Sequence, residues 1–158
     1  MDMLARREHS VGELRIKLLR KGHTPVVVTQ AMTGLQQDGL VSDQRFAEML
    51  LTVRRGRGVG PLRIRKELQE KGVAEELINQ YLDVSSPEWI EDVRRVRQKK
   101  YGDELPTNYA ERARQARFLQ YRGFTLDQIQ RVLNADDADK SSTAHEKLRT
   151  ARPFFKIL

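Results

Sequence analysis

The chain has 158 residues, a formal net charge of +7 and no cysteine. The lack of cysteine excludes disulfide bonds, thiolate chemistry and zinc sites with thiolate ligands. No segment approaches the ~20 apolar residues of a membrane-spanning helix, so we expect a soluble cytoplasmic protein without a membrane partner. The basic charge favours nucleic acid or an acidic protein surface as the partner.

One short helix recurs three times and organises the chain. Residues 60–72 read G-P-L-R-I-R-K-E-L-Q-E-K-G. Pro61 fits the first helical position, and Gly72 can end the helix in the left-handed conformation. Related segments end at Gly22 and Gly123, and each carries a leucine four residues before its glycine. Because the glycines are 50 and 51 residues apart, the pattern predicts a tandem array of roughly fifty-residue units.

Start and end signals give each repeat the same order of short helices. Ser10 with Glu13, and Thr125 with Gln128, have the spacing of a capping box. The apolar period is helical throughout, and no alternating segment predicts a strand. The expected helices span residues 10–21, 24–38, 42–55, 61–71, 75–82, 86–100, 111–122 and 125–133.

These helices predict an all-α fold of tandem three-helix modules in an elongated, curved array. No short helix can bury its apolar face alone, so neighbouring modules are expected to stack. We place the modules at residues 1–40, where the first helix is short, at 41–85 and at 86–134. Residues 135–158 are expected to form a polar, acidic tail with an apolar end. The third organising helix departs most from the pattern, because Gln115 replaces the apolar Leu14 and Ile64.

Two basic runs are candidate contacts for a partner or for nucleic acid. Arg54, Arg55, Arg57, Arg63, Arg65 and Lys66 form the first, Arg94, Arg95, Arg97, Lys99 and Lys100 form the second, and Arg15 and Lys17 are weaker candidates. Successive charges point around a helix, so the sequence defines no single face, and a solvated surface is the alternative. The glycine-rich residues 56–60 are either a structural joint or a loop that contacts anions.

No constellation predicts an enzyme, a cofactor or a metal site. The three histidines lack ligand spacing, and no motif of a nucleophile surrounds any serine. The acidic residues at 136–139 lack the glycine and distant glutamate of a calcium loop. The aromatic residues could stack on bases, but their helical spacing favours packing within the fold. The aromatic residues in question are Trp89, Tyr101 and Tyr121.

Four motifs, taken in order, resemble the RecX family of recombinase regulators. They are R-R-E-H-S-x-x-E-L-R-x-K-L from residue 6, D-G-L-V-S-D-x-R-F-A from residue 38, R-x-x-G-x-G-P-x-R-I-R-x-E-L-x-x-K-G from residue 55, and K-K-Y-G followed by R-F-L-x-Y-R-G-F from residues 99 and 117. The resemblance implies modules distantly like helix-turn-helix units and no catalytic residues. It also implies binding to the RecA filament, with inhibition of its ATPase, strand-exchange and coprotease activities, and accessory binding of single- and double-stranded DNA.

Two functions from different classes therefore stay open at this point. The first is a monomeric, non-enzymatic modulator that lies along a RecA–DNA filament. The second is an autonomous DNA-binding repeat protein, either a repressor or an architectural protein, because three-helix modules can place a helix in the major groove. A footprint at a defined DNA site without RecA would favour the second.

Overall fold

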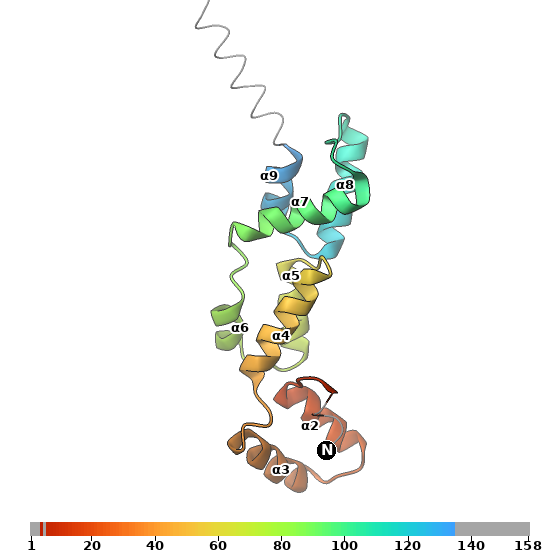
Figure 1. Cartoon of the computed structure of the whole chain (residues 1–158). Helices are drawn as coiled ribbons and strands as arrows, with labels where there is room; N and C mark the ends of the chain where they lie inside the picture. Colours follow the sequence, from red (N-terminus) through yellow and green to blue (C-terminus); the bar gives the residue numbers. More distant parts are fainter. Residues whose placement is uncertain (1–3, 5, 135–158) are drawn as a thin grey trace, which may run out of the picture.

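The computed structural model describes residue 4 and residues 6–134, and the predicted tail at 135–158 lies outside this range. Every element within the described residues is an α-helix: α2 (Val11–Arg20), α3 (Pro25–Gln37), α4 (Asp43–Gly56), α5 (Pro61–Glu70), α6 (Glu75–Tyr81), α7 (Glu88–Tyr101), α8 (Tyr109–Arg122) and α9 (Leu126–Leu133). Figure 1 shows an elongated molecule with α2 and α3 at one end, α4–α6 in the middle and α7–α9 at the other end. The predicted all-α repeat fold is confirmed.

Polar side chains begin most of the helices, as the sequence predicts. Ser42 and Asn108, for example, each accept a hydrogen bond from the third backbone N–H of the helix that follows. The predicted capping box at Thr125 and Gln128 is complete. Two boundaries differ from prediction. α7 begins at Glu88, with Pro87 as its N-cap, and the Asn108 cap starts α8 at Tyr109, ahead of the expected start.

Two separate hydrophobic cores stabilise the array. The first module has a small core of Leu14, Val28, Met32 and Val41. One continuous larger core runs through the second and third modules and includes Phe46, Ile64, Ile78, Leu119 and Ile129. The last two modules are therefore joined by apolar packing, whereas the first packs largely on itself.

The unusual Gln115 of the third repeat is buried and has a dedicated partner. Its Oε1 accepts a hydrogen bond from Nε of Arg97 at 3.0 Å. The other Arg97 nitrogens donate to the carbonyl oxygens of Gly102 and Glu104. The third module thus replaces an apolar core contact with a polar pair that satisfies a buried cation.

The start of α5 docks on the end of α8 through direct backbone contacts. The N–H of Gly60 donates to the carbonyl of Arg122 at 2.8 Å, and the N–H of Leu62 donates to the carbonyl of Gly123 at 3.0 Å. A Cβ atom on Gly60 would lie 2.3 Å from the carbonyl carbon of Gly123, so no side chain fits. This joint ties the second module to the third.

The equivalent start of α2 docks on the end of α5, where side chains make the polar contacts. Ser10 Oγ donates to the carbonyl of Lys71 at 2.6 Å while it caps the N–H of Glu13. The Glu13 carboxylate binds Lys71 Nζ at 3.2 Å and Arg7 at 2.6 Å, so it does not complete the predicted capping box at Ser10. Backbone also meets backbone here, because a Cβ atom on Gly12 would lie 2.7 Å from the carbonyl oxygen of Lys71. The first joint therefore combines a close backbone approach with the charged cluster of Glu13, whereas the second adds two backbone hydrogen bonds.

Acidification is expected to weaken the first joint through Glu13. Burial alone would raise the pKa of Glu13, but hydrogen bonds from Arg7 and Lys71 lower it to about 2 from the usual 4.5. A depressed folded-state pKa stabilises the fold above the unfolded-state value, and this stabilisation is lost as the pH falls from 4.5 towards 2. His9 also faces this cluster through Lys17, and burial lowers its pKa below 6.5, so its protonation adds a further loss on acidification.

The measurement is the melting temperature of the wild type and of Glu13→Gln at pH 5 and pH 3. We expect the wild type to lose more stability than the variant between these two pH values. The other carboxylates and His9 titrate in both proteins, so the difference between the two losses reports Glu13. Equal losses would show that Glu13 is not linked to folding.

Candidate functional site

The glycine-rich loop after α4 lies against the third module. Gly58 has a φ of +74°, and a Cβ atom there would lie 2.8 Å from Cγ2 of Val96 on α7. A side chain at this position is thus disfavoured by backbone conformation and by contact. The loop forms the structural joint that was one of the two predicted alternatives, and it also borders the basic cleft described below.

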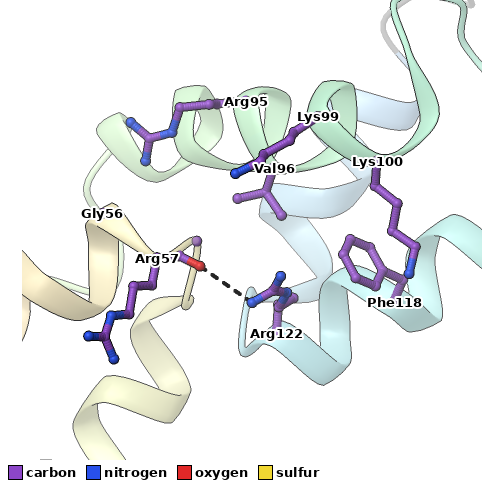
Figure 2. A pocket seen from close by; sticks show the side chains of 9 residues that line it. Gly56, Arg57, Arg95, Val96, Lys99, Lys100, Phe118 and Arg122 are labelled. Atoms are coloured by element: carbon purple, nitrogen blue, oxygen red, sulfur yellow. Dashed lines mark hydrogen bonds between the residues drawn. The ribbon is translucent and has the colours of Figure 1, made fainter.

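A cleft of about 410 Å³ lies where this loop meets α7 and α8. Val96 and Phe118 supply its apolar lining, and Gly56 and Gly58 contribute backbone. Figure 2 shows Arg95 and Lys99 on α7, Lys100 beside the ring of Phe118, and Arg122 facing the backbone of Arg57. Its charged lining residues are all basic: Arg57, Arg95, Lys99, Lys100 and Arg122.

Most of the cleft's positive charge has no carboxylate partner among the described residues. Arg95 is the exception, through a 2.6 Å contact with Asp92. Lys100 Nζ lies 4.1 Å from the centre of the Phe118 ring, and Arg122 donates to the carbonyl of Arg57 at 3.4 Å. Within the described chain, no ion pair or hydrogen bond holds the charged end of Arg57 or Lys99. The cleft is suited to an anion with several negative groups, such as successive phosphates.

The residues of the first predicted basic run make different kinds of contact in the structure. Arg54 donates to Glu67 at 2.7 Å, and this hydrogen bond lowers the pKa of Glu67. Arg55 pairs with Asp92 and Glu88 and lies over the ring of Trp89, so it ties α4 to α7. Arg65 pairs with Glu75. These three guanidinium groups serve the fold, and of the run only Arg57 reaches the cleft.

The remaining members of that run lie on exposed surface. Lys66 is exposed and lies 3.9 Å from Glu70. Arg63 donates to the carbonyl of Tyr121 at 3.2 Å and lies over its ring. The Tyr121 side chain is 77% exposed, against the prediction that the aromatic residues pack, whereas Trp89 is buried as predicted.

The second predicted run supplies three of the five basic side chains that line the cleft. Arg95, Lys99 and Lys100 line it, but Arg94 pairs with Glu91 on the exposed side of α7. Arg97 is only 4% exposed, so the expectation that it faces a partner is corrected by its burial against Gln115. In the first module, distant from the cleft, Arg15 contacts Thr29 and Lys17 contacts His9 and Glu13.

Sequence reasoning missed Arg122 and Phe118 as members of the cleft. Arg122 occupies the repeat position just before the terminal glycine, which is also basic in Lys21 and Lys71. That recurrence was a signal for a shared role at helix ends. It did not reveal that Arg122 approaches Arg57, which is 65 residues away in the chain.

Comparison with known proteins identifies the family over all three modules. Models of the first, second and third three-helix domains of RecX match residues 1–35, 42–82 and 88–133 in that order. The chain belongs to the RecX family. It is 42% identical over 139 residues to the regulatory protein RecX of Halorhodospira halophila, covering 88% of this chain and 86% of that protein. It is 43% identical over 137 residues to that of Ectopseudomonas mendocina, covering 87% and 91%.

Solved RecX structures share the fold. The crystal structure of RecX from Lactobacillus salivarius aligns with a TM-score of 0.71 over 87% of this chain and 91% of that one, at 17% identity. A second structure of a regulatory protein RecX aligns with a TM-score of 0.68 over 85% and 67% of the two chains, at 21% identity. Membership of this family supports a regulatory role, and no catalytic activity is indicated for it.

Two further findings concern metal sites and membrane-spanning helices within the described residues. No cluster of three or more histidine, aspartate or glutamate side chains in residues 6–134 is arranged to hold a metal ion. In the same part of the chain, no helix has the length and apolar character required to cross a membrane.

Proposed function

We propose that the protein binds the RecA filament on DNA and inhibits its ATPase, strand-exchange and coprotease activities. Membership of the RecX family over all three modules carries this proposal. An elongated array has the shape to lie along a helical filament, where it contacts several subunits at once. We propose that it acts as a monomer in the cytoplasm.

We further propose that the basic cleft provides the accessory contact with DNA. Its unpaired cations lie between two modules whose relative position is fixed by the Gly60 joint. Phosphate contacts of this kind carry affinity without sequence information. Arg57, Lys99, Lys100 and Arg122 are therefore the proposed DNA contacts, and the buried Arg97 is not.

The last helices of the second and third modules give less support to the alternative, an autonomous sequence-reading DNA-binding protein. The first turn of α6 carries Glu75 and Glu76, and that of α9 carries Asp127. Carboxylates at these positions would repel the phosphates that flank a groove. A DNase footprint at a defined site without RecA would favour this alternative.

The test is ATP hydrolysis by RecA on single-stranded DNA while the protein is titrated below and up to one copy per RecA. A parallel series measures binding to bare DNA at two salt concentrations. We expect inhibition at concentrations well below those that coat bare DNA. Inhibition that appears only at DNA saturation, and that weakens steeply with salt, would instead indicate competition for phosphates and contradict the proposal.

A further inference from the structure

The first module carries an exposed aliphatic patch that packing within the array does not explain. Ile16 and Leu19 on α2 are 48% and 38% exposed, and Val26 and Val27 on α3 are 67% and 51% exposed. We call these four residues the module 1 patch. Single exposed aliphatic residues are ordinary, but a group on two packed helices indicates an interaction surface.

The internal repeat shows that the fold does not require apolar residues at three of these positions. Positions equivalent to Ile16 hold Lys66 and Arg117, and those equivalent to Leu19 hold Gln69 and Gln120. All four of these polar residues are exposed. The positions equivalent to Val26 hold exposed acidic residues, Glu76 and Asp127. Only the first module replaces this charged or amide surface with aliphatic side chains.

The repeat also indicates that the patch residues lie near one another. Ile16 and Leu19 are three residues apart and lie on one side of α2. In the second module, the amide of Gln69 donates to Glu75 in the first turn of α6 at 3.0 Å. Leu19 and Pro25 hold the positions equivalent to Gln69 and Glu75, so we infer that Leu19 faces the first turn of α3, where Val26 and Val27 follow Pro25.

The charges around the patch select an acidic occupant. Residues 14–37 contain four cations and no aspartate or glutamate, and α3 has no charged residue at all. The cations are Arg15, Arg20, Lys21 and Lys17, of which Lys17 also contacts Glu13 at the first joint. A partner with an apolar centre and an acidic rim complements this surface in both respects.

Charge argues against other occupants. A second copy would bring the same four cations against themselves, and the apolar segment at 149–158 carries Arg149, Arg152 and Lys156 without an acidic side chain. Nucleic acid fits the cations but gains little from four aliphatic side chains at positions where the other modules are mostly polar.

We propose that the module 1 patch is the protein-binding anchor of this regulator and seats an apolar, acid-rimmed surface of the RecA filament. This inference rests on the proposed function and assigns its protein contact to the module farthest from the basic cleft (Figure 1). Under this proposal the first module binds protein, and the cleft between the second and third modules binds DNA.

The second module provides the replacement residues for a test of this proposal. The triple variant Ile16→Lys, Leu19→Gln, Val26→Glu gives the first module the residues of the second and leaves the net charge unchanged. The matched control is Leu126→Gln, which alters an aliphatic side chain that is 52% exposed on α9. Measured quantities are the concentration for half-inhibition of the RecA ATPase, the affinity for single-stranded DNA, the melting temperature and the molar mass in solution.

For the triple variant we expect the half-inhibition concentration to rise roughly ten-fold or more, as for removal of an interface centre. DNA affinity, melting temperature and a monomeric mass should match the wild type, and Leu126→Gln should inhibit normally.

Unchanged inhibition by the triple variant would overturn the anchor while the proposed function stands. An equal loss of DNA affinity would assign the patch to nucleic acid, and a dimeric wild type made monomeric by the variant would assign it to self-association; either result overturns the anchor. Failure of the wild type to inhibit would refute the proposed function itself.

Discussion

Replacing Lys99 and Lys100 by glutamate is expected to weaken binding to single-stranded DNA by ~10-fold or more at low salt. Both ammonium groups line the basic cleft, and neither has a carboxylate partner in the described chain. Glutamate at these positions removes two phosphate contacts and introduces repulsion. The dependence of log affinity on log salt should also become shallower, by ~0.7 for each phosphate of a single strand that the protein no longer neutralises.

The comparison variant is Lys66→Glu with Arg131→Glu, which changes the net charge equally but lies outside the cleft. Both side chains are exposed, at 76% and 63%. Lys66 belongs to the basic run that the sequence favoured, so this pair separates the sequence-based surface from the cleft. Fluorescence anisotropy with a labelled oligonucleotide measures both variants over a salt series. Equal losses in the two would mean that overall charge, and not the cleft, determines DNA affinity.

Replacing Gly60 by alanine is expected to destabilise the protein by ~1–3 kcal/mol, the range typical of overpacking. Gly60 has a φ of −81°, which alanine adopts easily, so the effect comes from contact and not from backbone conformation. The added methyl group would lie 2.3 Å from the backbone of Gly123, which cannot move aside as a flexible side chain can. Relief of this contact stretches two backbone hydrogen bonds and separates the walls of the cleft.

Urea unfolding, followed by the fluorescence of Trp89 and by circular dichroism, measures this effect. Trp89 is the single tryptophan and lies against Arg55 across the joint, so it reports the contact between the modules. The control is Gly34→Ala, since a Cβ atom there meets nothing within 4 Å and the residue is inside α3. Alanine is expected to stabilise that helix by ~0.5–1 kcal/mol. A Gly60→Ala protein as stable as the wild type would show that the joint is looser than the structure indicates.

The two joints suggest that the modules respond differently to solution conditions. The first combines the Glu13 cluster, Ser10 and the close approach of Gly12 to Lys71, and it separates two hydrophobic cores. The second is closed by backbone hydrogen bonds and by a shared core. Ion pairs contribute to both joints, since Arg55 pairs with Asp92 across the second, but only the second has a hydrophobic core shared by its two modules.

The sequence by itself determined the repeat, the helices and most of the core. Local signals carry this information: Ser42 and Thr125 cap the helices they precede, and Leu14, Ile64 and Leu119 are buried at repeat positions that the apolar period marks. It also determined the family, because the order of four motifs is specific. Gln115 was identified as the exception, although its partner Arg97 was assigned to the surface.

Only the tertiary structure decided which cations are available to a partner. Charges along a helix point around its axis, so their number in a run does not define a face. Arg54 and Arg55 find carboxylates 13 and 37 residues away, and these pairings remove them from the candidate surface. Arg122 joins Arg57 across 65 residues because Gly60 lets two modules meet at their backbones. The position of each charge relative to its partners is a property of packing between distant segments, which no local pattern encodes.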